Sequence, residues 1–168
     1  GGSIFGRFGF SDVLTMFLAM DSYVELYKGG VVSMEDFAKS KRDRDILVRI
    51  IVKKKPGAMA YISQRNSSTD FPVLACAAAL YEDGSSRVAV GACPSRAKLV
   101  EDSQELLAGF LMKDSEEQQK AAQDFASYAQ AHVTTGSNMR ASKEYRSHLV
   151  KVLVKRALLT AGGRRNGN

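Results

Sequence analysis

Few of the side chains that build metal or catalytic centres occur in this sequence. It contains only two histidines and two cysteines among 168 residues. His132 and His148 lie in helical patterns far apart in the chain, and neither has a cysteine or a carboxylate at ligand spacing. No serine lies in a nucleophile-elbow motif, so a Ser-His-Asp triad has no support. We therefore expect no metal site and no catalytic residue in this chain.

Long apolar runs are missing as well. A membrane-spanning helix needs about 20 apolar residues, whereas the most apolar early segment, 13–20, is bracketed by Asp12 and Asp21. No charged-then-apolar signal sequence begins the chain. Cys76 and Cys93 lie in apolar, strand-like runs, which is typical of buried structural thiols rather than nucleophiles. We expect no membrane partner and a cytoplasmic, thiol-reducing setting.

Acidic charge is in the minority, because the formal net charge is +6. A basic protein can bind nucleic acid. Here the basic clusters at 53–55 and 164–165 are separated, and no aromatic residues interleave with them. This distribution is typical of a solvated surface, so we expect no nucleic-acid partner.

The composition, with 45% hydrophobic residues, allows one substantial core and a second, smaller one. A stretch of three lysines, a proline and a glycine at 53–57 discourages regular structure and divides two independently patterned halves. We therefore predict two domains, comprising residues 1–55 and residues 56–168.

The first half opens on a glycine-rich stretch, 1–10, followed by Ser11 as the cap of a helix over 12–20. A glycine-rich stretch before a helix start leaves backbone N–H groups free to bind an anion. The stretch has neither a GxGxxG motif nor a P-loop lysine, so it also fits a plain turn. Strands are predicted at 22–28 and 46–52, with a short helix capped by Ser33 between them.

The second half has the pattern of a small antiparallel sheet on three helices. Turn residues at 82–86 separate two strand-like runs and predict a hairpin. Helices are predicted over 100–112 and over 115–133, the second with Ser115 and Gln118 as a capping box. A third, at 137–158, is capped by Ser142 and stopped by two glycines at 162–163. The predicted inner face of this last helix consists of Tyr145, Leu149, Val152, Leu153 and Arg156.

The order of residues in the last helix resembles a known signature. Asn138-Met139-Arg140-Ala141-Ser142-Lys143-Glu144-Tyr145-Arg146, with the Arg-Ala-Leu ending at 156–158, is similar to the closing helix of the flavin subunits of molybdenum hydroxylases, the xanthine dehydrogenase and carbon monoxide dehydrogenase family. Family members usually have Asp at the position of Asn138. The segments 2–12 and 91–97 resemble the same family.

This resemblance implies a fold, a cofactor and partners. The fold would be α+β, with part of a vanillyl-alcohol-oxidase-type FAD-binding lobe ahead of the small sheet. FAD would be the cofactor, and an iron-sulfur subunit, a molybdopterin subunit and NAD as electron acceptor would be the partners. The implied cofactor-binding residues are Gly2, Ser3, Phe5, Gly6, Asp12 and Leu47. Ile62 departs from the family, in which many members have Lys nearby.

Two functions from different classes stay open. In the first, the chain is part of a flavoprotein that passes electrons from an iron-sulfur partner to an acceptor. In the second, it is a docking or assembly module without flavin. The family's flavin subunits are longer, with a first FAD-binding lobe ahead of the position of Gly1, and the sequence opens without Met. We therefore interpret the chain as a fragment and expect it to bind FAD weakly when isolated.

Overall fold

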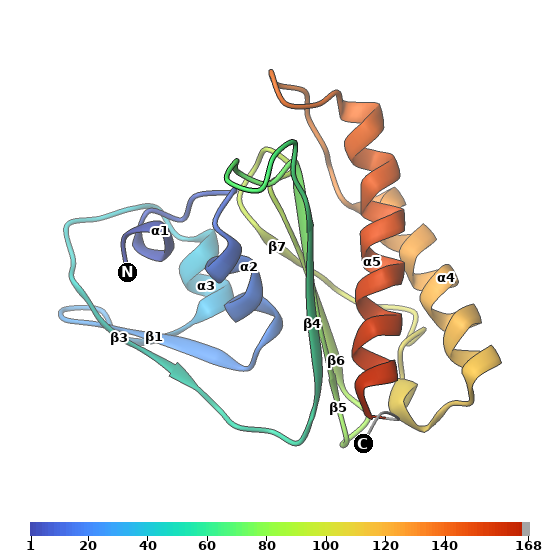
Figure 1. Cartoon of the computed structure of the whole chain (residues 1–168). Coiled ribbons are helices and arrows are strands. Elements are labelled where there is room, and N and C mark those ends of the chain that lie inside the picture. Colours follow the sequence, from blue (N-terminus) through green and yellow to red (C-terminus); the bar gives the residue numbers. More distant parts are fainter. Residues whose placement is uncertain (166–168) are drawn as a thin grey trace.

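A four-stranded antiparallel sheet lies at the centre of the molecule (Figure 1). The structure is a computed structural model that describes residues 1–165, with side chains to residue 163. The strands are β4 (Gly57–Gln64), β5 (Leu74–Tyr81), β6 (Ser86–Gly91) and β7 (Lys98–Val100), in that order. The predicted hairpin is confirmed, because β5 and β6 pair antiparallel with Cys76 opposite Val90.

The central strand β5 is buried along its whole length because both faces of the sheet are covered. Its side chains alternate between two cores. Cys76, Ala78 and Leu80 join the core under the long helices. Ala77 and Ala79 join the smaller core on the opposite face. The run of alanines in β5 lets helices approach the sheet closely from both sides.

The N-terminal lobe covers one face of this sheet and carries a second sheet of its own (Figure 1). It contains α1 (Gly2–Phe5), α2 (Asp12–Ala19), β1 (Ser22–Leu26), β2 (Gly30–Ser33), α3 (Met34–Lys39) and β3 (Leu47–Val52). The strand order is β2-β1-β3, with both pairs antiparallel.

Both predicted caps in this lobe are confirmed. The Ser11 hydroxyl accepts from the backbone N–H of Leu14 at 3.2 Å, and Ser33 accepts from that of Asp36 at 3.0 Å. The glycine-rich stretch is not a loop throughout, since residues 2–5 form the single-turn helix α1. The lobe ends at Val52, and β4 begins at Gly57. The division into domains at 53–57 stays a prediction.

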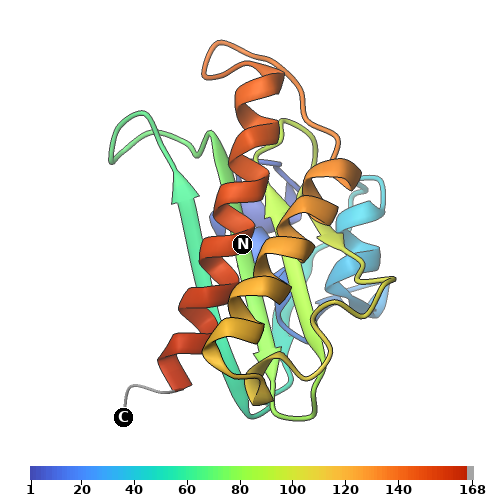
Figure 2. The same cartoon turned by 90° about the vertical axis from the view of Figure 1, so that its right-hand side faces the viewer.

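Two long helices, α4 (Ser115–His132) and α5 (Lys143–Arg165), cover the other face of the central sheet (Figure 2). The α+β class is thereby confirmed. The helix predicted over 100–112 was wrong, because this segment forms β7, a series of turns and the 3-10 turn η1 (Phe110–Met112). The capping box of α4 also lies one residue earlier than predicted, with Asp114 and Glu117 in place of Ser115 and Gln118.

The inner face of α5 is rotated by one position from the prediction. Ser142 caps the helix as predicted, because its hydroxyl accepts a hydrogen bond from the backbone N–H of Tyr145 at 3.2 Å. Tyr145 itself is 46% exposed, and Arg156 is exposed as well. The buried positions of the helix are Arg146, Leu149, Val150, Leu153, Val154, Ala157, Leu158 and Ala161.

The glycine pair at 162–163 does not stop α5, which continues to Arg165. A Cβ on Gly162 would lie 3.0 Å from Oε1 of Gln118 and 3.1 Å from the ring of Phe110. This glycine therefore allows α5 to approach α4 and η1 closely. Among residues 1–165, no helix is long and apolar enough to cross a bilayer.

Candidate functional site

Four of the six predicted cofactor positions lie in or beside α1. Gly2, Ser3 and Phe5 belong to the helix, and Gly6 follows it as the C-cap. Gly1 is the N-cap and provides no side-chain hydrogen bond to the first turn. Because the first N–H groups of a helix have no intrahelical acceptor, α1 presents backbone donors at the exposed Gly1 and Gly2.

Phe5 and Leu47 pack against the small core of the N-terminal lobe. The Phe5 ring lies 6.3 Å from that of Phe37 in α3, centroid to centroid. Leu47 stands opposite Leu26 in the β1–β3 pair. Both predicted contact residues are therefore half-buried and have apolar neighbours within the chain.

Two arginines connect the short elements of this lobe through hydrogen bonds to backbone carbonyls. Arg7 is 3% exposed and donates to the backbone carbonyls of Phe5 at 2.7 Å and Phe37 at 3.1 Å. Burial lowers the pKa of its guanidinium. Arg96 donates to the carbonyl oxygens of Ala38 and Ser40 at the end of α3, at 3.0 and 2.6 Å. Arg7 thereby joins α1 to α3, and Arg96 joins the loop before β7 to the end of α3.

Asp12 points away from α1 and toward the central sheet. Its carboxylate accepts a hydrogen bond from the Tyr61 hydroxyl on β4 and forms an ion pair with Arg65 at 2.7 Å. Burial, together with the Asp12 carboxylate, raises the pKa of Tyr61 well above its ordinary value. The hydrogen bond to Asp12 also raises the pKa of Arg65. Asp12 thus links α2 to the sheet, and 40% of its side chain remains exposed.

The polar network continues from Arg65 to the loop before α5. Nη1 of Arg65 donates to the backbone carbonyl of Asp70 at 2.7 Å, and the Asp70 carboxylate pairs with Arg140 at 2.9 Å. The hydrogen bond from Arg140 lowers the pKa of Asp70. Segments from three distant parts of the sequence, around 12, 65–70 and 140, therefore meet at one end of the sheet.

Arg146 lies at the same end and is only 1% exposed. It donates to the carbonyl oxygens of Val73 at 3.0 Å, Gly136 at 2.5 Å and Ala141 at 3.0 Å. It also donates to Oδ1 of Asn138 at 2.6 Å. Burial lowers the pKa of the guanidinium. The Asn-to-Arg signature in the sequence thus fixes the loop before α5 against β5.

An aromatic cluster that sequence reasoning missed covers this network. The rings of Phe8 and Phe10 stack at 5.2 Å, and Phe71 lies 4.2 Å from Phe10. Arg140 lies over Phe71, and Arg42 lies over Phe8, at 5.4 and 5.7 Å. Phe10, Phe71 and Arg140 line a small cavity of about 160 Å³. No periodic pattern predicts this cluster, because its phenylalanines come from two loops.

The two thiol groups lie in the interior of the fold. Cys76 and Cys93 are free and buried, as predicted. Burial raises the pKa of Cys76 to about 12, so its thiol stays protonated at neutral pH. Among the described residues, no group of three or more His, Cys, Asp or Glu side chains is arranged to hold a metal ion.

Known proteins share this architecture. Quinoline 2-oxidoreductase from Pseudomonas putida 86 superposes with a TM-score of 0.80 at 22% identity, over 97% of this chain and 60% of the other. Carbon monoxide dehydrogenase from Hydrogenophaga pseudoflava gives a TM-score of 0.81 at 22% identity, over 98% and 60%. Reconstituted CO dehydrogenase from Oligotropha carboxidovorans gives 0.81 at 21%, with the same coverage. At these identities the likeness concerns the fold, and the chain spans 60% of the length of each solved structure.

A search of curated proteins gave no match. Residues 59–161, in contrast, match the family described as the CO dehydrogenase flavoprotein C-terminal domain. The match includes β5, β6, α4 and most of α5, together with Arg146 and the groups that accept its hydrogen bonds. The resemblance to the flavin subunits of molybdenum hydroxylases is thereby confirmed. The chain belongs to the CO dehydrogenase flavoprotein C-terminal domain family.

Proposed function

We propose that this chain is part of the FAD-binding subunit of a molybdenum hydroxylase, an oxidoreductase complex. It would help to pass electrons from an iron-sulfur partner, through FAD, to an acceptor, for which NAD is our candidate. The partners would be the iron-sulfur and molybdopterin subunits of the complex, in the cytoplasm. Membership of a flavoprotein family supports the cofactor, and the two free, buried cysteines agree with a reducing compartment.

Membership of the flavoprotein family carries this proposal, and the exposed start of α1 is where we expect the cofactor. A Cβ built on Gly2 would meet no atom within 4 Å, so no neighbour within the described chain requires glycine there. A glycine without a packing reason leaves backbone that a ligand can approach closely. The uncapped N–H groups beside it favour a negatively charged group such as a phosphate of FAD.

The other candidate positions would serve the cofactor in different ways. Asp12 would accept a hydrogen bond from an FAD hydroxyl, since each carboxylate oxygen can accept more than one bond and the side chain is partly exposed. Phe5 and Leu47 would form part of the floor of the cofactor site, because both pack on the core of the N-terminal lobe. When bound, FAD supplies the redox chemistry, and these residues hold and orient it.

The docking or assembly module remains a second candidate, and the contacts of Asp12 favour it. Both carboxylate oxygens already have partners, Tyr61 and Arg65, and Phe5 and Leu47 already pack in the lobe. These contacts are made within the chain and require no cofactor. In that case the chain would bury its surface against partner subunits and carry no flavin.

The substitution Gly2→Val separates the two candidates. Its side chain enters open space, so the thermal midpoint should not fall, whereas close approach of a phosphate to the α1 backbone is blocked. Gly163→Val is the matched control, because a Cβ at Gly163 also meets nothing within 4 Å. FAD affinity is measured by flavin fluorescence, with the chain lengthened at its N-terminus to match its solved relatives. A loss of affinity in Gly2→Val alone supports the flavin site, and equal affinity in all three proteins rejects it.

A further inference from the structure

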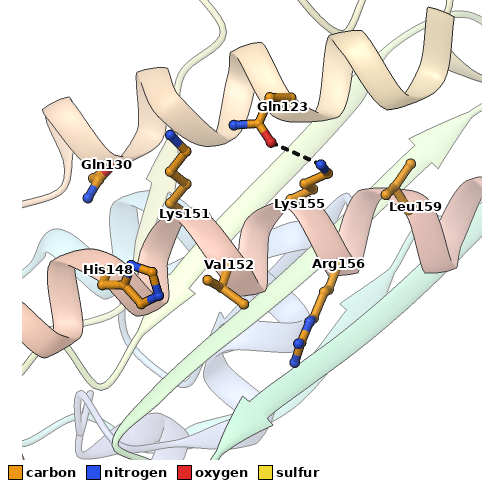
Figure 3. A pocket seen from close by; sticks show the side chains of 8 residues that line it. All are labelled: Gln123, Gln130, His148, Lys151, Val152, Lys155, Arg156 and Leu159. Atoms are coloured by element: carbon orange, nitrogen blue, oxygen red, sulfur yellow. Dashed lines mark hydrogen bonds between the residues drawn. The ribbon is translucent and has the colours of Figure 1, made fainter. Parts of the chain in front are cut away.

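A groove of about 560 Å³ runs along the outer surface of α5, beside α4 (Figure 3). Its lining residues belong to α4 and α5, which cover the opposite face of the central sheet from α1 and α2 (Figure 1). The side chains along α5 are His148, Lys151, Val152, Lys155, Arg156 and Leu159. From His148 to Leu159 the groove is roughly 16 Å long, at 1.5 Å per helical residue.

The charged side chains that line this groove are all positive. Three of the α5 side chains carry permanent positive charge, and no carboxylate lines the groove. Nζ of Lys155 is bonded only to the neutral Oε1 of Gln123, at 2.9 Å (Figure 3). Among the described side chains, Lys151 and Arg156 have no ion-pair partner. No described carboxylate therefore pairs with this charge, which is complementary to an acidic partner.

The spacing of these side chains favours a helix as that partner. His148, Val152, Lys155 and Leu159 follow each other at steps of four, three and four residues. This is the spacing of a coiled-coil seam, in which every residue of the seam meets the facing helix. Lys151 and Arg156 lie directly beside the seam, at the positions whose charges decide which partner binds. Nucleic acid fits less well, because no Phe, Tyr or Trp side chain lines the groove as a platform for stacking bases.

We propose that this groove docks an acidic amphipathic helix of a partner protein, packed as a third helix beside α4 and α5. Apolar side chains of that helix would cover Val152 and Leu159. Its flanking Glu or Asp side chains would pair with Lys151 and Arg156. The proposal does not depend on the flavin assignment, since the groove and α1 lie on opposite faces of the sheet.

The test uses a synthetic helical peptide of three heptads, with Leu at the seam positions and Glu at the flanking positions. Its affinity for the full chain is measured by fluorescence anisotropy. In the double variant Lys151→Glu/Arg156→Glu we expect roughly a tenfold loss of affinity, because attraction at two sites becomes repulsion. A second peptide, with Lys in place of the Glu residues, should bind this variant better than the unmodified chain. Lys28→Glu, exposed in the turn between β1 and β2 of the N-terminal lobe, is the matched control.

Each alternative gives a different result. No binding of the acidic peptide at millimolar concentration would overturn the proposal. So would equal affinity for a short DNA duplex, since the groove would then be a general anion-binding surface. Self-association of the chain that the double variant abolishes would instead identify a second copy as the occupant. Circular dichroism of each variant shows that a loss of binding is not a loss of folding.

Discussion

Arg146, at 1% exposure, donates a 2.6 Å hydrogen bond to Oδ1 of Asn138, eight residues earlier in the chain. The same guanidinium donates to three backbone carbonyls, one from Val73 just before β5 and two from the loop before α5. A buried cation is tolerated where its hydrogen bonds are all made. The signature shared with the family is therefore a structural feature that fixes the loop and the start of the last helix.

Replacing Arg146 by Lys should destabilise the fold strongly. A lysine ammonium cannot reproduce the planar set of donors, so about three hydrogen bonds to buried acceptors are lost. At about 1 kcal/mol each, the free energy of unfolding should fall by roughly 3 kcal/mol. Urea denaturation measures this change. Arg156→Lys, at an exposed position on the same helix, should leave the midpoint within experimental error, and a similar result for Arg146→Lys would contradict the assigned role.

Replacing Asn138 by Asp should stabilise the fold by about 1 kcal/mol at pH 7, because the neutral acceptor of Arg146 becomes an anionic one. The guanidinium would lower the pKa of the new carboxyl in the folded state. The added stability is then present above the ordinary Asp pKa of about 4 and lost as the pH falls through the folded value. Denaturation at pH 7 and pH 3 measures this difference. In an Arg146→Met background the gain should vanish, and a gain that persists would exclude the pairing.

Leu149 and Tyr145 lie one helical turn apart on α5 but differ in burial. Leu149 is 6% exposed, whereas Tyr145 is 46% exposed. Leu149→Ala should therefore lower the free energy of unfolding by about 2 to 5 kcal/mol, while Tyr145→Ala should change it by about 0.5 kcal/mol or less. Thermal or urea unfolding of both variants tests the packing, and equal effects would place the inner face of α5 elsewhere.

The stretch between β3 and β4 should be the first site of limited proteolysis. Lys53, Lys54 and Lys55 are exposed, and no strand or helix includes them. Trypsin should cut after Lys53 or Lys54, because Pro56 protects the bond after Lys55, and mass spectrometry identifies the fragments. First cleavage within 149–158 would show that the predicted boundary is wrong.

Local patterns in the sequence predicted most of the elements. The caps at Ser11, Ser33 and Ser142, the hairpin and the strands depend on neighbouring residues, so their signals are visible in the sequence. The segment 100–112 has apolar residues at helical spacing, yet Glu105 and Gly109 adopt positive φ. The carboxylate of Asp102 accepts from the N–H groups of Leu106 and Leu107, which replaces a helical turn.

Contacts between distant parts of the chain determine the features that local sequence patterns did not predict. Tyrosine is buried in proteins more often than arginine, which favours Tyr145 over Arg146 for the core. The backbone carbonyls of the loop before α5, however, need the guanidinium of Arg146 as their donor. Arg146 therefore faces inward, and the buried face of α5 is rotated relative to the prediction. Gly162 has the pattern of a helix stop, whereas close packing against Gln118 and Phe110 explains it. For the candidate site, the resemblance predicted Gly2 and Asp12. It did not predict the hydrogen bonds of Asp12 with Tyr61 and Arg65, which come from the other half of the chain.

An FAD titration tests the flavin assignment on two proteins, the chain alone and the chain preceded by the first FAD-binding lobe of its family. One wall of a site leaves most of a large cofactor in water, so the chain alone should bind FAD weakly or not at all. The lengthened chain should bind it tightly and lose affinity on Asp12→Ala. Arg65→Met, which breaks the same ion pair but removes no proposed cofactor contact, should retain affinity. A lengthened chain that binds no FAD, or one in which Asp12→Ala has no effect, would contradict the flavin assignment.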